Sequence, residues 1–376
     1  MDTASRLGIK KVFSVEFVVD FFDRSRNFYI EKMGLVETHR STPQWEERFK
    51  SKAIYFSAND VRLMVSTPLS NHSYTAQYLK ILCPGIRNVT LQVEDLDRAV
   101  DYLKDHHATF VHPEKVVEAG DSRHRFVTIA TPIGFLEITF LEITGNEEDI
   151  PMFEKVAHPP AERSPFKNID HMTINARTLY PVYNFFEHVL DFKKFWSVSF
   201  HTPDTRSGRK GTGLSSQVMY DPGSQVKFAT NEPLYPHFNE SQIQTFVERN
   251  HGAGIQHIAL AVDNLLETVE TLKGRGIEFL DTPDTYYDML PERIAKQNIG
   301  KIREEIKDLK KAGILVDGEN GDYLLQIFLK DASGLYHEEN AGPFFFEIIQ
   351  RCGHPGFGEG NFRALFEAIE MQESVS

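Results

Sequence analysis

The chain has 376 residues, 41% of them hydrophobic and 12% aromatic, which is enough material for two domains with well-packed cores. Its formal net charge of −13 argues against binding to nucleic acid or to an anionic membrane surface. No apolar run approaches the ~18–20 residues of a membrane span, the start lacks the apolar stretch of a signal peptide, and two cysteines cannot build a disulfide scaffold. We therefore expect a cytoplasmic protein.

One pattern of predicted elements recurs along the chain. A strand followed by an amphipathic helix begins near Phe13, Ile86, Asn168 and Ile255. The match is clearest between residues 86–111 and 255–280, where apolar residues recur at i, i+4 and i+7 of each helix. Further strands follow, joined by turn signals such as Pro-Ile-Gly and Asp-Pro-Gly. We therefore predict an α+β fold of four βαβββ modules, in which each pair of modules forms one half-open barrel domain.

The boundary between the two pairs of modules falls in residues 147–165. This stretch is rich in proline and glutamate and shows no sustained hydrophobic period. We place the domains at 1–155 and 156–376. We expect the first to serve as a scaffold and in oligomerisation, as a dimer or tetramer, and the second to carry the functional site for the reasons that follow.

Three ionisable residues lie inside runs of β-forming apolar residues: His171 in IDHMTI, His257 in IQHIAL and Glu347 in FFFEII. Burying one polar group without a partner costs roughly 2–7 kcal/mol, and a cation shared by all three would remove that cost. A lone histidine on a strand is more often a hydrogen-bonded core residue. Here both histidines stand at the same point of a strand, just ahead of a predicted helix, which favours ligands. Two histidines and one carboxylate are typical of non-haem Fe(II) oxygenases.

The repeat allows the two halves to be compared. His257 aligns with Asn88, His171 aligns near Ser14, and Glu347 aligns with Glu137 in GFLEITF. On this alignment the N-terminal half keeps a carboxylate but has neither histidine. A purely structural role for a strand histidine would not predict its loss from one half only. We therefore expect a single metal site, in the C-terminal half.

The glycine-rich segment GFGEGNFRALFEAIEM, from Gly356, follows a predicted strand. A dinucleotide-binding loop would need a further strand and an acidic residue about 20 positions later, which the sequence does not offer. We instead predict a glycine hinge and an amphipathic C-terminal helix with Phe362, Phe366 and Ile369 on one face. Two interpretations stay open, a helix that is simply docked on the domain and a lid over the site at Glu347.

These residues carry a resemblance to a known family. The modules resemble the vicinal-oxygen-chelate superfamily, and the C-terminal half is similar to the 4-hydroxyphenylpyruvate dioxygenases within it. The matching stretches are NEP at Asn231, SQIQTF at Ser241, GAGIQHIAL at Gly252, FLDTPDTYYDML at Phe279, ILVDGENGDYLLQIF at Ile314, FFFEIIQR at Phe344 and GFGEGNFRALFEAIE at Gly356. The resemblance implies an enzyme of tyrosine and phenylalanine catabolism that converts 4-hydroxyphenylpyruvate and O2 to homogentisate and CO2. It also implies one Fe(II) per chain, held by His171, His257 and Glu347.

The resemblance further implies which residues contact the substrate. Polar contacts come from Ser216, Asn231, Gln242, Gln256 and Gln326, the substrate ring lies between Phe328 and Phe362, and Phe366 belongs to the lid helix. Gln326 is notable without the family too, because a buried amide among apolar neighbours needs a partner. Two positions depart from the family pattern: Ala229 stands where proline is usual, and Thr173-Ile174 where a glycine is usual. Neither change removes a ligand.

Three other functions fit parts of the pattern. A hydroxymandelate synthase would use the same substrate and iron, but that family departs at NEP and at the two lid phenylalanines, which are intact here. A zinc or manganese enzyme of glyoxalase type would not need the aromatic pocket. A non-catalytic binding protein of bleomycin-resistance type would not need all three ligands. The dioxygenase is therefore the function we expect.

Overall fold

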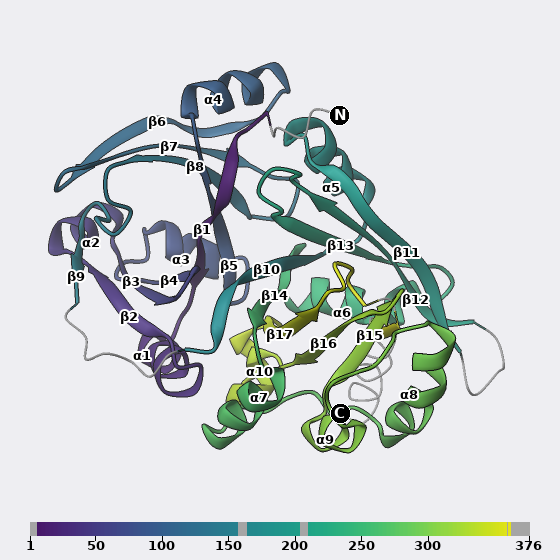
Figure 1. Cartoon of the computed structure of the whole chain (residues 1–376). Coiled ribbons are helices and arrows are strands. Elements are labelled where there is room, and N and C mark those ends of the chain that lie inside the picture. The colour runs from purple at the N-terminus through teal and green to yellow at the C-terminus, as the bar shows by residue number, and fades with distance from the viewer. Residues whose placement is uncertain (1–5, 157–163, 204–209, 359, 362–376) are drawn as a thin grey trace.

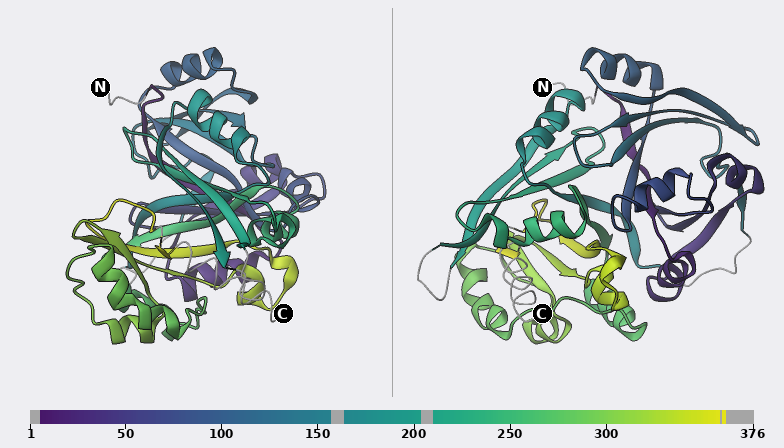
Figure 2. Two further views of the ribbon diagram at one scale, coloured as in Figure 1. Left: turned by 90° about the vertical axis from the view of Figure 1, so that its right-hand side faces the viewer. Right: turned by 180° about the vertical axis from the view of Figure 1, so that it is seen from behind.

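The computed structural model describes residues 6–156, 164–203, 210–358 and 360–361. Two curled sheets, one from each half of the chain, form its frame (Figure 1). Figure 2 shows the same two halves from the side and from behind. The expected α+β architecture of two half-open barrels is confirmed. None of the helices in the described ranges combines the length and the apolar character that crossing a membrane requires.

The N-terminal sheet has, among the described residues, nine strands in the order β6-β7-β8-β5-β1-β4-β3-β2-β9. They are β1 (Ile9–Val18), β2 (Val36–Ser41), β3 (Ser51–Ala58), β4 (Val61–Pro68), β5 (Gly85–Val93), β6 (Phe110–Ala119), β7 (Ser122–Ala130), β8 (Glu137–Thr144) and β9 (Phe153–Lys155). The helices of this half are α1 (Phe22–Asn27), continued by the π-helical turn η1 (Phe28–Lys32), α2 (Pro43–Phe49), α3 (Tyr74–Leu79) and α4 (Leu96–Asp105).

The C-terminal sheet has, in the same described part, eight strands in the order β11-β12-β13-β10-β14-β17-β16-β15. They are β10 (Phe166–Asn175), β11 (Lys193–Pro203), β12 (Lys210–Tyr220), β13 (Lys227–Pro233), β14 (Gly254–Val262), β15 (Leu315–Glu319), β16 (Asp322–Phe328) and β17 (Phe345–Cys352). Its helical elements are α5 (Tyr180–Asn184), η2 (Phe185–Val189), η3 (Phe238–Glu240), α6 (Gln242–Arg249), α7 (Leu265–Gly274), α8 (Asp284–Lys296), α9 (Ile306–Ala312), α10 (Ala332–Tyr336) and η4 (Glu339–Ala341).

The four predicted modules are present as β1-α1-β2-β3-β4, β5-α4-β6-β7-β8, β10-α5-β11-β12-β13 and β14-α7-β15-β16-β17. Local capping explains where two of the module helices begin. The side chains of Asp95 and Asn264 accept hydrogen bonds from the backbone N–H groups of Arg98 and Glu267, which caps α4 and α7. Each of these helices buries the leucines at the two ends of its apolar stripe. The hydrophobic pattern and the caps therefore agree on these elements.

The last strand of the N-terminal sheet, β9, ends at Lys155, and the first strand of the C-terminal sheet, β10, begins at Phe166. The two halves touch along β4, β5, β10 and β14. The rings of Phe17 and Phe344 also meet across this junction, with centroids 4.9 Å apart. The division into domains 1–155 and 156–376, and the scaffold role of the first, stay predictions.

The central strand pair of the C-terminal half, β10 with β14, has three register shifts, two of which are β-bulges beside the predicted histidine ligands. Between the pairs Ile169–Leu260 and His171–Ala259, β10 has one extra residue, Asp170. Between the pairs Thr173–His257 and Ile174–Ile255, β14 has one extra residue, Gln256. An extra residue interrupts the alternation of faces and re-aims the side chains beside it. Each predicted histidine ligand therefore follows directly on a bulge residue.

The pair β1 with β5 in the N-terminal half carries the same two bulges. Here the extra residues are Phe13, which precedes Ser14, and Arg87, which precedes Asn88. The shared bulges match Ser14 with the first histidine and Asn88 with the second. The predicted alignment of these two positions is therefore confirmed, and the N-terminal half has no histidine at either.

The alignment predicted for Glu347 is wrong. Glu347 pairs with the residue two positions after the histidine of β14, whereas Glu137 pairs with Asn88 itself. The matching residue is Thr139, whose Oγ1 accepts a hydrogen bond of 2.9 Å from the Asn88 amide. A shift of two residues along a strand keeps every side chain on its face, so the hydrophobic pattern cannot detect the error. The N-terminal half has thus replaced all three ligands.

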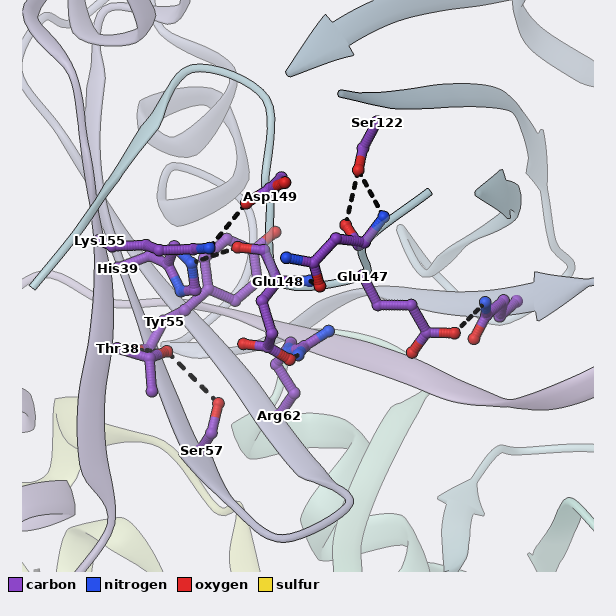
Figure 3. A network of polar contacts seen from close by, with 12 residues as sticks. Thr38, His39, Tyr55, Ser57, Arg62, Ser122, Glu147, Glu148, Asp149 and Lys155 are labelled. Carbon is purple, nitrogen blue, oxygen red and sulfur yellow. Dashed lines mark hydrogen bonds and ion pairs between the residues drawn. The ribbon is translucent and has the colours of Figure 1, made fainter. Parts of the chain in front are cut away.

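Residues 147–149 contact side chains of the corresponding face of the N-terminal sheet (Figure 3). His39 on β2 belongs to a row of paired residues that runs across β3 and β4 to Glu16 on β1, so both side chains lie on this face. Nε2 of His39 donates a hydrogen bond of 2.9 Å to the Glu148 carbonyl. The Glu148 carboxylate pairs with Arg62, and Glu147 accepts hydrogen bonds from Lys11 and Gln92. This half therefore covers part of this face with its own chain.

Candidate metal centre

The three predicted ligands come from neighbouring strands, because β14 lies between β10 and β17. His171 pairs with Ala259, and Ala259 pairs with Glu347, so these residues form one row across the sheet. His257 precedes Ala259 by two residues and therefore points to the same side. The strand register alone thus brings two imidazoles and one carboxylate together on one face of the sheet.

The three side chains meet at close range and away from water. The Oε2 atom of Glu347 lies 3.4 Å from Nε2 of His171 and 3.3 Å from Nε2 of His257. The exposed fractions of these residues are 3–4%. Across the described residues, no other group of three such side chains is drawn together in this way. The second carboxylate oxygen of Glu347 has no hydrogen-bond partner within the described part of the chain, so the donor set fits a divalent cation.

The electrostatics of the site favour an ionised carboxylate. Burial alone would raise the pKa of Glu347, but the two histidines outweigh burial and lower that pKa to about 2. Burial also lowers the pKa of His257, and its contact with Glu347 offsets this only in part. For His171 burial acts in the same direction, but Glu347 and Asp170 together raise the pKa above its ordinary value. A cation that binds Nε2 of His171 competes with a proton for the same nitrogen.

The bulge residues orient both imidazoles. Oδ1 of Asp170 lies 2.8 Å from Nδ1 of His171, and Oε1 of Gln256 lies 3.1 Å from Nδ1 of His257. Because both partners offer oxygen acceptors, each Nδ1 carries the proton and each Nε2 keeps its lone pair for the metal. Gln256, which the sequence predicted as a substrate contact, has its carbonyl oxygen on a ligand, and its contact with substrate stays a prediction.

Five buried polar residues share the face of the ligands. Asn175, Asn231 and Ser216 form a row across β10, β13 and β12, and Asn231 donates to Oδ1 of Asn175 at 3.0 Å. Thr173 lies between His171 and Asn175 on β10, and Gln326 lies two residues before the partner of Glu347 on β16. Within the described residues each of the five keeps one polar atom without a hydrogen-bond partner. Buried polar atoms of this kind call for a polar ligand.

Aromatic rings lie beside both histidine ligands. Phe328 pairs with Glu347 in the sheet, and its ring lies 6.1 Å from that of His257. Phe345 stacks on His257 with a centroid distance of 4.9 Å, and Phe357 meets the His171 ring edge-on at 4.7 Å. The sequence reasoning missed Phe345 and Phe357. For Phe345 the available signal was its position two residues before Glu347, which places both on one face.

Comparisons with known proteins agree with this geometry. The model of the Glyoxalase/Bleomycin resistance protein/Dioxygenase superfamily matches residues 11–136 and 168–290. Curated 4-hydroxyphenylpyruvate dioxygenases are similar over most of their length. The one from Dictyostelium discoideum is 33% identical over 94% of this chain and 95% of its own, and the one from Caenorhabditis elegans is 35% identical over 96% and 91%. The chain belongs to the 4-hydroxyphenylpyruvate dioxygenase family.

Membership in the 4-hydroxyphenylpyruvate dioxygenase family makes this chain a metal-binding dioxygenase. Solved structures add evidence on the fold alone. A variant of 4-hydroxymandelate synthase from Streptomyces coelicolor superimposes with a TM-score of 0.83 at 22% identity, over 97% of this chain and 99% of its own. At that identity the likeness does not favour the synthase reaction over the dioxygenase reaction.

Only some of the residues predicted to contact substrate lie on the face of the metal ligands. Ser216, Asn231, Gln326 and Phe328 lie on the face of the metal ligands, as described above. Gln242 is buried at the start of α6, which packs against β10 and β13. Phe362, Phe366 and the predicted lid helix lie outside the described residues. The role of all these residues as substrate contacts stays a prediction.

The two departures from the family pattern lie close together. Thr173 pairs with Ala229 on β13, and both are buried on the ligand face. Ile174, the neighbour of Thr173, points to the other face into the core. The small side chain at Ala229 packs with Val218 and Phe357.

Proposed function

We propose that this chain is an Fe(II)-dependent dioxygenase that converts 4-hydroxyphenylpyruvate and O2 to homogentisate and CO2. The observation that carries the proposal is the buried set of His171, His257 and Glu347 on one sheet face, in a chain that is 33–36% identical to three curated 4-hydroxyphenylpyruvate dioxygenases over more than nine tenths of its length. Two nitrogens and one oxygen on one side of a cation leave positions open on the other side, as non-haem Fe(II) oxygenases require.

The chemistry then divides between the ion and the chain. When bound to these ligands, ferrous iron supplies the dioxygen chemistry and the charge that attracts a 2-oxo acid. In the overall reaction the side chain loses its carboxylate as CO2. One atom of O2 completes a new carboxylate at the former keto carbon, and the other becomes a ring hydroxyl while the side chain moves to the neighbouring carbon. No external 2-oxo acid is consumed.

The residues of the chain bind, orient and exclude water. Glu347 supplies the fixed negative charge, and each histidine would offer Nε2 to the metal with its proton on Nδ1. The neutral amides and hydroxyls of Ser216, Asn231 and Gln326 offer hydrogen bonds to a polar substrate without adding charge. Phe328 and the neighbouring rings form apolar walls that keep water from the reacting centre.

The proposal is tested by loading the protein with Fe(II) without oxygen and then measuring O2 uptake with 4-hydroxyphenylpyruvate. Homogentisate and CO2, each formed in a one-to-one ratio with O2 consumed, are expected. Formation of 4-hydroxymandelate would identify a synthase instead. An iron-loaded protein that consumes no O2 with this substrate would overturn the proposal. The cytoplasmic location and the dimeric or tetrameric assembly stay predictions.

A further inference from the structure

Arg351, near the end of β17, uses its guanidinium group on two targets at once. Nε and Nη2 donate to the two carboxylate oxygens of Asp170, each at 2.6 Å, which is the bidentate geometry of a strong ion pair. Nη1 donates to the backbone carbonyls of His354 and Gly356 at 3.0 and 2.7 Å. The pair is sheltered, since the Arg351 and Asp170 side chains are 21% and 8% exposed.

Both targets of Arg351 contact the same metal ligand. Oδ1 of Asp170, which accepts from Arg351, also faces Nδ1 of His171. The carbonyls of His354 and Gly356 belong to the loop that precedes Phe357, whose ring packs against the His171 ring. One guanidinium thus fixes the hydrogen-bond acceptor at the back of this imidazole and the loop that supports its edge.

The N-terminal half provides a comparison within the chain. The shared bulge places Phe13 at the position of Asp170. Thr139 corresponds to Glu347, so Ile143, four residues further along β8, corresponds to Arg351. The half without ligands has therefore lost both members of the ion pair. If the ion pair only held the strands together, we would expect it in both halves and not only in the half that has His171.

We propose that Arg351 is a positioning residue of the metal centre, which acts through Asp170 and the loop of residues 353–357 to hold the His171 ring with Nε2 toward the metal. The inference rests on the metal centre of the proposed function. With Arg351 in place Asp170 cannot turn away, because both of its oxygens are engaged. Without it the imidazole loses its fixed acceptor and its supporting loop together, and the ring is free to rotate or to move its proton to Nε2.

The test measures metal binding rather than turnover. Metal-free wild type, Arg351→Gln and Asp170→Asn are titrated with Co(II), whose visible absorption reports the ligand geometry. We expect both variants to bind about 10–100-fold more weakly and to show an altered Co(II) spectrum. Arg351→Lys keeps the positive charge but not the bidentate geometry of the guanidinium group, so its Co(II) affinity should lie between those of Arg351→Gln and wild type. The double variant should lose little more than the larger single loss, because the two residues act as one unit.

Arg249→Gln is the matched control. Arg249 pairs with Asp331 at 3.0 Å in the same half of the chain, but neither residue contacts a ligand. It should leave the Co(II) affinity and spectrum unchanged. Asp170→Asn is isosteric and decides the question if Arg351→Gln does not fold. A folded Arg351→Gln or Asp170→Asn protein with wild-type affinity and spectrum would overturn the positioning role. If wild type itself bound no Co(II) or Fe(II), the proposed metal centre would fall and this inference with it.

Discussion

Thr139 stands in the N-terminal sheet at the position that Glu347 holds in the C-terminal sheet. The Thr139 hydroxyl accepts a hydrogen bond from the Asn88 amide, while the Glu347 carboxylate faces two imidazoles. The same place in the duplicated fold is therefore closed by neutral hydrogen bonds in one half and built from charged and titratable groups in the other.

Replacing Glu347 by Gln should remove the metal without unfolding the protein. The amide has nearly the same shape but lacks the charge that two neutral histidines need beside them to hold a dication. We expect metal content below a tenth of the wild-type value and no measurable O2 uptake, checked by elemental analysis and an oxygen electrode. Glu137→Ala is the control, because Glu137 pairs with Arg87 and not with a ligand position. Loss of metal from folded Glu137→Ala would show that the metal site had been assigned to the wrong half of the chain.

The metal-free protein should lose stability in acid partly through Glu347. Its folded-state pKa of about 2 lies below the ordinary 4.5, so the ionised form contributes stability above pH 4.5, and that contribution is lost as the pH falls toward 2. A depression of this size corresponds to roughly 3 kcal/mol. Urea unfolding of wild type and Glu347→Gln between pH 7 and pH 3 should give a difference that shrinks as the pH falls. A difference that does not change with pH would contradict the assigned ionisation.

Asn231→Ala should weaken substrate binding and leave the metal in place. The change removes a buried amide whose Oδ1 has no partner among the described residues and breaks its hydrogen bond to Asn175. The loss of one such hydrogen bond corresponds to about a tenfold increase in KM, with metal content unchanged. Thr230→Val is the control, since Thr230 immediately precedes Asn231 on β13 and is equally buried but points to the opposite face. Equal KM changes in both variants would remove Asn231 from the substrate site.

Phe357→Ala should uncouple oxygen consumption from product formation. The ring packs against His171 and against Trp196, so its removal opens a path for water to the centre. We expect more than one O2 consumed per homogentisate, measured by an oxygen electrode alongside chromatography. Phe279→Ala controls for the loss of a buried ring, because Phe279 is similarly buried but stacks under Lys273 away from the ligands. A ratio that stays at one in Phe357→Ala would show that the ring does not exclude water.

The sequence predicted the modules and the two histidines because both leave periodic signals. Alternating apolar residues mark the strands, and the same His position occurs in two modules. The partner of Glu347 in the other half could not be found this way. GFLEITF and FFFEIIQ look alike as strings, but the pairing of β8 with β5 and not the string determines which residue faces Asn88.

The residues that support the site were also beyond sequence reasoning. Asp170 and Gln256 sit beside the histidines and would point away from them in a regular strand, so alternation predicts the opposite of what the bulges produce. Arg351 is 181 residues from Asp170 along the chain, and no local pattern links them. Asn175, by contrast, could have been predicted, because it stands four residues after His171 on the same face.

The bulges make the two ligand strands sensitive to length. The equivalent bulges of the N-terminal half form at Phe13 and Arg87, so a bulge does not need Asp or Gln in order to form. Deleting the bulge residue has a different effect from replacing it. Deletion of Asp170 or Gln256 would restore the regular alternation of the strand. The side chains on one side of the deletion would then point to the opposite face of the sheet, and the pairing that places a histidine beside its neighbours would be lost. Single-residue deletions at these two positions should therefore be far more damaging than any substitution there.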